Sequence, residues 1–163
     1  MIDDNSPEAY EAYRAKYGVG PFVTCDAIVT RGGPKHSWWD ILLINRKKLP
    51  FTNRLALPGG FMEPTDYNVV HGAIRECEEE TNLILKPEWA ESTIICDGMH
   101  RDPRARIIGI ATHFQLPRGE FGNEIKAKDD AEKVDWYNIP TILAQANVNF
   151  AFDHGDTIKR FLQ

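Results

Sequence analysis

The order of the predicted elements places this chain in the α+β class, with a mixed sheet layered against helices. Apolar and β-branched runs predict several strands, whereas helical periodicity is restricted to an N-terminal helix, one long central helix and short C-terminal segments. These helices are too few to cross over between every pair of strands, as a doubly wound fold requires. The 163 residues, of which 42% are hydrophobic and 26% charged, suffice for one domain with a substantial core.

The first predicted element is a short helix within residues 6–17. Pro7 suits its first turn, and Gly18 ends it. Tyrosines at helical spacing line one face of this helix: Tyr10, Tyr13 and Tyr17. This face favours packing against the domain, and a lid over a nearby pocket is the alternative. The chain therefore divides into an N-terminal helical segment, residues 1–20, and one domain, residues 21–163.

Two strands are predicted next, at residues 22–30 and 39–45, and they form a hairpin with a long connection. The Trp38-Trp39 pair could stack on a base, although aromatic residues at a strand start are more often involved in packing. Four basic residues beyond the second strand bring positive charge close to the Gly-Gly turn at 59–60: Arg46, Lys47, Lys48 and Arg54.

The second half of the chain is predicted to return to strands after the central helix, at residues 92–96, 106–116 and 134–137. A helical turn follows at residues 141–146. The chain ends in an amphipathic helix for which Asp153 is a suitable N-cap.

Charge and cysteine usage exclude several classes of protein. The net charge of −5 argues against a nucleic-acid surface. The three cysteines, Cys25, Cys77 and Cys96, lack CxxC spacing, so neither a disulfide framework nor a zinc site is expected. No secretory segment and no apolar run near the length of a membrane span is present, so we expect no membrane association and a reducing, cytoplasmic setting.

The central helix, predicted over residues 68–81, carries an unusual density of negative charge. Its carboxylates fall within five residues: Glu76, Glu78, Glu79 and Glu80. At about 100° per residue, an apolar stripe should face the core. This stripe consists of Val70, Ala73, Ile74 and Cys77. Glu76, Glu79 and Glu80 share the face beside the stripe, whereas Glu78 points away.

Partly desolvated carboxylates on one face repel one another, which raises their pKa values unless a cation compensates. Oxygen donors grouped in this way suit a hard divalent ion, Mg²⁺ or Mn²⁺, that keeps several waters and engages substrate phosphates. From composition alone, a solvated acidic face is the more frequent explanation of a glutamate run. The glycine-containing loop that precedes the helix favours the metal site.

With that loop included, the segment resembles the signature of the Nudix hydrolases. The residues that carry the resemblance are Gly60, Glu63, Asp66, Arg75, Glu76, Glu79 and Glu80. Asp66 stands where the family usually has Glu, and it is one residue further from Arg75 than usual. Asn82 replaces the terminal glycine, which lies in a left-handed conformation that Asn tolerates.

The resemblance implies a Nudix fold, in which a mixed sheet lies between helices and a loop–helix–loop holds Mg²⁺, with Mn²⁺ as a possible substitute. Metal ligation falls to Glu76, Glu79, Glu80 and Gly60. Glu79, Glu80 and Arg75 are the implied catalytic residues, and Arg75 orients carboxylates by pairing with them. Family members often place a further acidic residue in a later loop. We expect Glu124 in this role, then Asp129, among candidates that also include Glu120, Asp130 and Glu132.

Motifs outside this segment resemble the ADP-ribose pyrophosphatase branch, and more narrowly the Nudix domain fused to nicotinamide mononucleotide adenylyltransferases. They are the loop at residues 101–104, the strand that starts at Arg106, and Phe152-Asp153-His154. The implied substrate-binding residues are Arg54, Gly60, Asp102, Arg104 and Arg106. A guanidinium fork suits phosphate oxygens. For Arg104 an ion pair with Asp102 is the alternative, and a packed histidine is the more frequent role for His154.

The activity expected from the resemblance is Mg²⁺-dependent hydrolysis of ADP-ribose to AMP and ribose 5-phosphate. The first alternative is the same chemistry on a dinucleotide or a nucleoside triphosphate. The second is a Nudix-like regulator that senses ADP-ribose without hydrolysing it. Such regulators carry a winged helix after the Nudix domain, and the few residues after Phe152 leave no room for one. We expect a small-molecule nucleotide substrate, no nucleic-acid partner and a homodimer.

Overall fold

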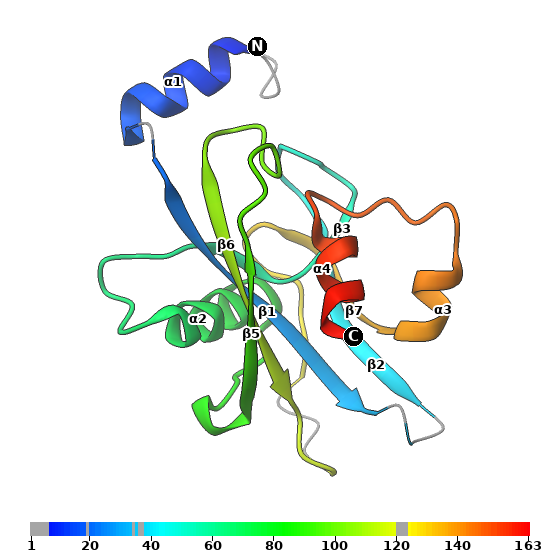
Figure 1. Cartoon of the computed structure of the whole chain (residues 1–163). Coiled ribbons are helices and arrows are strands. Elements are labelled where there is room, and N and C mark those ends of the chain that lie inside the picture. The colour runs from blue at the N-terminus through cyan, green and yellow to red at the C-terminus, as the bar shows by residue number, and fades with distance from the viewer. Residues whose placement is uncertain (1–6, 19, 34, 36–37, 120–123) are drawn as a thin grey trace.

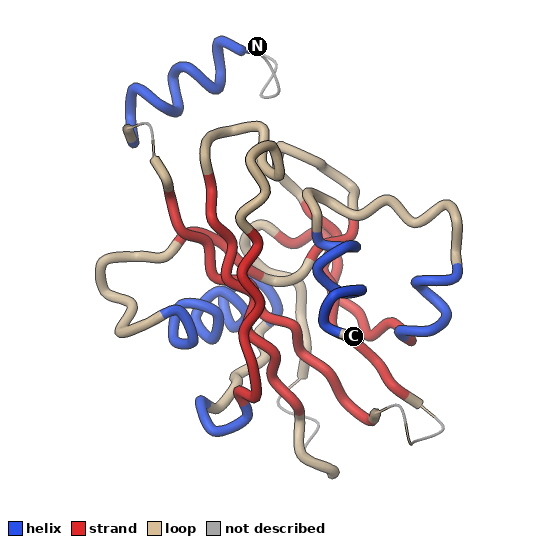
Figure 2. Tube along the Cα trace, in the orientation of Figure 1, coloured by secondary structure: helices blue, strands red, loops and turns tan. Residues whose placement is uncertain are grey.

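The computed structural model describes residues 7–163 apart from 19, 34, 36–37 and 120–123, and its centre is one seven-stranded mixed sheet (Figure 1, Figure 2). The main strands, in spatial order, are β3 (Leu55–Ala56), β2 (Trp39–Arg46), β1 (Phe22–Gly32), β6 (Ile107–Gln115) and β5 (Ala90–Cys96). β1 runs parallel to β6, and the other pairings are antiparallel. Off this path, β4 (Gly59–Phe61) pairs with β1 and β7 (Ala131–Asn138) pairs with β2.

Helices lie on both faces of this sheet, which confirms the predicted α+β architecture. They are α1 (Pro7–Tyr17), α2 (Val69–Thr81), the 3-10 helix η1 (Pro87–Trp89), α3 (Ile139–Ala144) and α4 (His154–Phe161). Side chains of β1 alternate between two layers, as the two-residue period of a strand requires. Ala27 and Val29 pack with α2, whereas Ile28 packs with α3 and α4.

The local sequence sets both ends of α2. The Asn68 side chain accepts a hydrogen bond from the His71 backbone N–H at 3.0 Å, which caps the first turn. At the other end Asn82 adopts φ 63°, the left-handed conformation expected for the residue that replaces the family glycine. Ala73 and Cys77 of the predicted stripe are fully buried. All three cysteines are free and buried.

The structure corrects several predicted boundaries. α3 begins at Ile139, two residues before the predicted start at residue 141, because the Asn138 side chain accepts from the Thr141 N–H at 3.1 Å and caps an earlier start. β7 extends from Ala131 to Asn138 because its whole length pairs with β2. The short strands β3 and β4 were not predicted as strands, since two or three residues carry no periodicity.

The predicted N-terminal helix is present as α1 and extends away from the sheet (Figure 1). Tyr13 lies against Phe22 and Phe61, with ring centroids 6.3 and 6.0 Å apart. The side chain of Tyr17 lies outside the described part of the structure. In the described ranges, no helix has the length and apolar character that crossing a membrane demands.

A buried histidine lies on the α4 face of the sheet, away from the glutamates of α2. His113 on β6 is 5% exposed, and its ring lies 4.4 Å from that of Phe161 in α4. Thr30 donates to Gln115 at 2.9 Å, so the His113 Nε2 must donate to the Thr30 hydroxyl, 2.7 Å away. Burial lowers the pKa of His113 to about 4. The Glu91 carboxylate, 3.3 Å away, is 58% exposed, and solvent screens its effect.

We expect Asn82→Ala to lower the free energy of unfolding by about 1–2 kcal/mol, because alanine is strained in the left-handed region. Asn82→Gly removes the strain but also removes the side-chain hydrogen bond to the Glu124 carbonyl, at 2.8 Å, so it should fall between alanine and wild type. Urea unfolding of the three proteins gives the order. An alanine variant as stable as wild type would contradict the expectation that alanine is strained at this position.

We expect stability to fall as the pH drops through the range from about 6.5 to 4, in part because of His113. Its folded pKa of about 4 lies below the unfolded value, so the unfolded chain binds the extra proton and the loss for this group reaches about 3 kcal/mol. His113→Asn removes this dependence. Denaturation of both proteins at several pH values should show a shallower slope for the variant, and identical slopes would contradict the assignment.

Candidate active site

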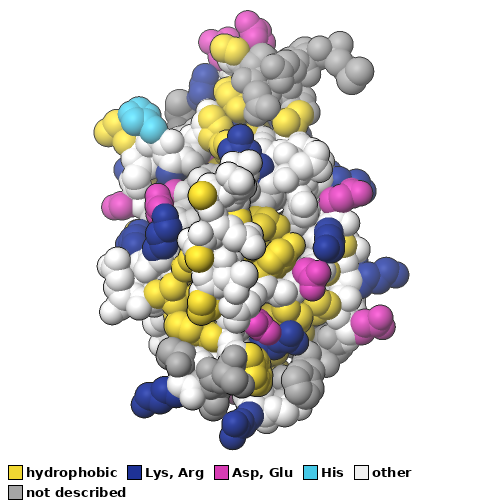
Figure 3. Space-filling view, turned by 90° about the vertical axis from the view of Figure 1, so that its right-hand side faces the viewer, with side chains coloured by type: hydrophobic (Ala, Val, Ile, Leu, Met, Phe, Trp, Pro, Cys, Tyr) yellow, Lys and Arg dark blue, Asp and Glu magenta, His cyan; other side chains and the backbone are white. Residues whose placement is uncertain are grey.

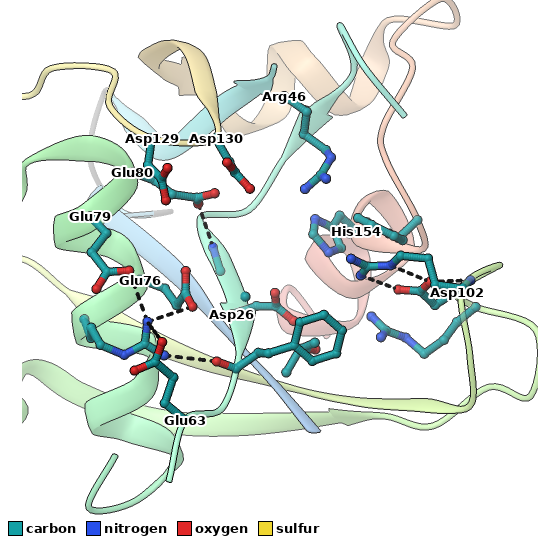
Figure 4. A pocket seen from close by; sticks show the side chains of 18 residues that line it. Asp26, Arg46, Glu63, Glu76, Glu79, Glu80, Asp102, Asp129, Asp130 and His154 are labelled. Carbon is teal, nitrogen blue, oxygen red and sulfur yellow. Dashed lines mark hydrogen bonds and ion pairs between the residues drawn. The ribbon is translucent and has the colours of Figure 1, made fainter. Parts of the chain in front are cut away.

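A pocket of about 310 Å³ lies between α2, the loop at residues 101–104 and the start of α4. One wall is acidic and carries Glu63, Glu76, Glu79, Glu80, Asp129 and Asp130. The facing wall carries Arg46, Arg101, Asp102, Arg104, Phe152 and His154. Figure 4 shows the glutamates on one side, Arg46, Asp102 and His154 on the other, and Asp26 of β1 between them. The helical wheel is confirmed at Glu78, which is exposed and is not part of the lining.

Arg75 connects the carboxylates of the acidic wall. Its Nε and Nη2 donate to Asp66, both at 2.9 Å, and its Nη1 donates to Glu76 at 2.8 Å and Glu79 at 3.1 Å. Nη2 also donates to the Phe61 carbonyl at 3.0 Å, which ties α2 to β4. These hydrogen bonds raise the pKa of Arg75 further above its usual range. One guanidinium therefore fixes three side chains and one strand.

Asp66 belongs to the support of this guanidinium and does not line the pocket. Its side chain is 5% exposed, pairs with Arg75 through both oxygens and accepts the Glu63 backbone N–H at 2.8 Å. The hydrogen bonds from Arg75 lower the pKa of Asp66. The shorter side chain and the extra residue before Arg75 therefore still deliver a bidentate ion pair.

Glu76 is held against a glycine. A Cβ at Gly60 would lie 2.5 Å from a Glu76 carboxylate oxygen, so any larger residue at this position would displace the carboxylate. Burial raises the pKa of Glu76 to about 7, against the opposing effect of its ion pair with Arg75. Gly60 and Glu76 thus line the same part of the pocket.

Glu80 is the most buried glutamate of the helix, at 3% exposure. Its carboxylate accepts the Gly59 backbone N–H at 2.9 Å. Burial raises the pKa of Glu80 to about 8, and the negative charge of Glu76 adds to the rise. Glu79 remains half exposed, with 47% of its side chain accessible. Burial, more than the predicted repulsion, therefore dominates the electrostatics of the two inner glutamates.

The donor set has the chemistry that a hard divalent cation requires, since it offers carboxylate and backbone carbonyl oxygens and no sulfur or imidazole. Within the part of the chain that the structure describes, no three acidic, His or Cys side chains are already grouped closely enough to hold an ion together. Glu76 and Glu79 are directed at Arg75 instead. The residues therefore fit such a cation by type, and these two carboxylates must turn from Arg75 to reach it.

The two carboxylates predicted as the further acidic residue of a later loop, Glu124 and Asp129, lie in different places in the structure. Asp129 lines the pocket, next to Asp130, and Lys48 forms ion pairs with both. Glu124 is exposed and outside the lining, and its backbone carbonyl accepts from the Asn82 side chain. Of the other candidates, Glu120 lies outside the described residues, and Glu132 is exposed on β7.

Only some of the predicted substrate-binding residues line the pocket. Gly60, Asp102 and Arg104 line the pocket, whereas Arg54 and Arg106 do not. The Arg54 guanidinium lies 5.2 Å from the Phe51 ring, and Arg106 donates to the Asp97 carbonyl at 2.8 Å.

Arg104 forms the ion pair with Asp102 that the sequence offered as the alternative to ligand binding, and it also lines the pocket. It pairs with Asp102 through Nε at 3.0 Å and Nη2 at 2.8 Å, so this ion pair fixes the plane of the guanidinium. The group lies 5.1 Å from the Phe61 ring and 5.3 Å from the Phe152 ring. Nη1 of Arg104 is not used in the pairing with Asp102.

Several residues of the pocket were not among the predicted site residues, and two of them are buried charged groups. Asp26 is 6% exposed, and burial raises its pKa to about 7. Its signal in the sequence is a carboxylate in the middle of an otherwise apolar strand. Arg46, at the end of β2, is 9% exposed and donates to the Pro50 carbonyl at 3.0 Å. Burial and the nearby charge of Arg104 lower the pKa of Arg46.

His154 is buried and hydrogen-bonded, in the role that the sequence favoured, and it also lines the pocket. It is 5% exposed, and its Nδ1 accepts the Leu57 backbone N–H at 3.0 Å. Burial lowers the pKa of His154 to about 3. The adjacent Asp153 forms a bidentate ion pair with Arg101, at 2.9 and 2.7 Å. The imidazole is therefore both anchored and neutral.

Comparison with known proteins agrees with this geometry. Residues 21–161 match the NUDIX domain family. The ADP-ribose pyrophosphatase of Methanocaldococcus jannaschii is 33% identical over 143 residues, which cover 88% of this chain and 74% of the relative. A bifunctional NMN adenylyltransferase/ADP ribose pyrophosphatase from Francisella tularensis, complexed with AMP and a Mn ion, superposes with a TM-score of 0.78 at 30% identity.

That superposition covers 95% of this chain and 45% of the Francisella protein, so the chain spans about half the length of this bifunctional relative. The NUDIX domain of Shewanella oneidensis NrtR, complexed with ADP ribose, superposes with a TM-score of 0.71 over 96% of this chain and 97% of that domain. Its 21% identity shows the fold alone. The family match and the Methanocaldococcus relative establish that the chain belongs to the Nudix family and is a hydrolase of phosphoric anhydride bonds.

Proposed function

We propose that this protein is a divalent-metal-dependent ADP-ribose pyrophosphatase that produces AMP and ribose 5-phosphate. The observation that carries the proposal is the two-sided pocket, in which carboxylates face guanidinium groups across a space of about 310 Å³. A diphosphate is the ligand that such an arrangement suits, because a cation held by the carboxylates and the arginines can bind its oxygens from opposite sides. The similarity to ADP-ribose pyrophosphatases supports the choice of substrate.

Glu76, Glu79 and Glu80, with the Gly60 carbonyl, would hold Mg²⁺ or Mn²⁺. The bound cation would neutralise diphosphate charge and lower the pKa of a bound water. Glu80 is held in place by the Gly59 N–H, and Arg75 restrains Glu76 and Glu79 until the cation competes for them. Arg75 then orients the helix face through Asp66 and the Phe61 carbonyl.

In the reaction, the oxygen of water attacks one phosphorus of the diphosphate, the bridging P–O bond breaks, and the second phosphate leaves with the bond electrons. A carboxylate accepts the proton of the water. We assign this role to Asp129 before Glu124, because Asp129 lines the pocket and its side chain is 62% exposed. On the facing wall, Arg104, which Asp102 holds in one plane, would bind a phosphate or ribose oxygen.

We expect the protein to convert ADP-ribose to AMP and ribose 5-phosphate in the presence of Mg²⁺ and not in EDTA. The test compares ADP-ribose with NADH, a diadenosine polyphosphate and the nucleoside triphosphates, with products identified by chromatography. If the protein prefers another of these compounds, the proposed substrate is wrong and the proposed hydrolysis of a phosphoric anhydride bond still holds. If the protein hydrolyses none of them, the proposed enzymatic activity is wrong, and a protein that senses ADP-ribose without hydrolysing it is favoured.

We expect Glu79→Gln and Glu80→Gln to reduce kcat by at least about a hundredfold, because each removes a charged oxygen ligand of the cation. Glu78→Gln is the matched control, since Glu78 lies on the same helix outside the pocket. Steady-state assays should be accompanied by Mn²⁺ titrations followed by electron paramagnetic resonance. Normal Mn²⁺ affinity in both variants would show that the metal assignment is wrong.

We also propose a homodimer. α1 extends from the domain, and an apolar pocket lies where it meets the body, lined by Tyr13, Pro21, Phe22, Val23, Phe61, Met62 and Pro64 among others. A second chain could cover this surface. Sedimentation analysis should give twice the chain mass of 18.5 kDa. A species of one chain mass at micromolar concentration would contradict the dimer.

A further inference from the structure

We propose that His154, through its Nε2–H, donates a hydrogen bond to a phosphate of the substrate and forms, with Arg46 and Arg104, a phosphate subsite opposite the glutamates. This inference rests on the proposed function for the identity of the ligand, a diphosphate. It assigns a binding role to a histidine that would otherwise be explained by packing alone. One phosphate of the diphosphate would bind to the cation that the carboxylates hold, and this subsite would bind the other phosphate.

The tautomer of His154 follows from one hydrogen bond. The Leu57 backbone N–H lies 3.0 Å from Nδ1 and can only donate, so Nδ1 carries no proton. The single proton of the neutral ring must therefore be on Nε2. Among the described residues, no hydrogen bond is made by Nε2, and the residue lines the pocket. A side chain that is 95% buried thus presents an unused donor at the active site.

The surroundings of His154 suit an anion. The ring centroid lies 5.3 Å from that of Phe152, and the guanidinium carbons of Arg46 and Arg104 lie 5.2 and 5.3 Å from the same ring. All three donors therefore surround one aromatic side chain. Figure 4 shows Arg46 and His154 on the same wall, across from Glu76 and Glu80.

The charge on this wall is only partly balanced. Arg101 is fully paired with Asp153, and Arg104 is paired with Asp102. Arg46 forms no ion pair with a described carboxylate within bonding distance, and its donors reach the carbonyls of Pro50 and Lys48. A buried guanidinium close to a second one is unfavourable without a counter-charge. A phosphate between Arg46 and Arg104 would supply that charge, and His154 would add a directed donor.

With Nδ1 held as an acceptor, His154 presents its Nε2–H donor over the whole physiological range of pH. The charged groups that face it are Arg46 on β2, Arg101 and Asp102 in the loop, and Asp153 at the start of α4. Burial is the main reason that the ring stays uncharged, and the nearby guanidinium of Arg101 acts in the same direction. His154 is thus a substrate-binding residue and not a proton carrier, because Nδ1 is occupied and a ring with so low a pKa is too weak a base to take up a proton.

Two substitutions separate the anchor from the donor. Asn places its carbonyl oxygen near the position of Nδ1, so His154→Asn can still accept from Leu57 but has no donor at Nε2. Gln reaches the position of Nε2, so His154→Gln can supply the donor and loses the anchor. His113→Asn is the matched control, because His113 is equally buried and lies outside the pocket.

The experiment measures the binding of inorganic pyrophosphate to the full chain in EDTA by isothermal titration calorimetry. Without metal, the arginine wall is the remaining phosphate site. We expect His154→Asn to weaken binding by about ten- to hundredfold, as for loss of a hydrogen bond to a charged group. His154→Gln should weaken it less although its melting temperature is lower, and His113→Asn should leave it unchanged. Wild-type affinity in a folded His154→Asn protein would overturn the proposal.

Two further measurements keep the test decisive. If His154→Asn does not fold, Arg104→Lys takes its place, and unchanged pyrophosphate affinity in that variant would overturn the subsite. The ratio of wild-type to His154→Asn affinity should stay constant from pH 6 to 8, and a ratio that grows toward pH 6 would show a charged imidazolium instead. Because no hydrolysis is measured, loss of binding in His154→Asn without any ADP-ribose turnover would reject the proposed function and retain the subsite.

Discussion

The guanidinium of Arg75 is the group on which the arrangement of the site depends. Its five N–H donors reach Asp66, Glu76, Glu79 and the Phe61 carbonyl, so one residue joins the entrance loop, the helix and β4. Lysine could not replace it, because a single ammonium cannot hold a planar set of acceptors in fixed directions. The side chain of Arg75 is only 21% exposed, so these hydrogen bonds form in a partly desolvated setting that strengthens them.

The sheet supplies the second constraint. In the antiparallel pairing of β1 and β4, Asp26 is opposite Gly59 and Cys25 is opposite Gly60. An added Cβ would lie 2.3 Å from the Asp26 carboxylate at the first glycine and 2.5 Å from the Glu76 carboxylate at the second. The two glycines therefore let a strand pass between two acidic side chains. This close approach brings Glu80 within reach of the Gly59 N–H.

The three glutamates that α2 contributes to the acidic wall were predictable because they lie on one helix. Helical periodicity alone separates Glu76, Glu79 and Glu80 from Glu78, and the structure places only the first three in the pocket. The facing wall was harder to predict, since Arg46 and His154 are more than one hundred residues apart in the chain and meet only through the packing of β2 and α4. Arg54 and Arg46 flank the same loop, and the sequence offers no periodicity in that loop to show which of them turns inward.

Burial, and not the number of charges, decides what each residue of the site can do. Glu79 and Asp129 have 47% and 62% of their side chains exposed, so water and a cation can reach their carboxylates. Glu80 and Asp26 are almost fully buried, and a charge on either is costly unless a cation is nearby. On the facing wall, burial keeps His154 neutral, and Arg46 has no carboxylate partner among the residues that the structure describes. The acidic wall thus lacks the positive charge that a metal ion would bring, and the arginine wall lacks the negative charge that a diphosphate would bring. Because the metal ion and the diphosphate also bind each other, cation and substrate should bind to this pocket cooperatively.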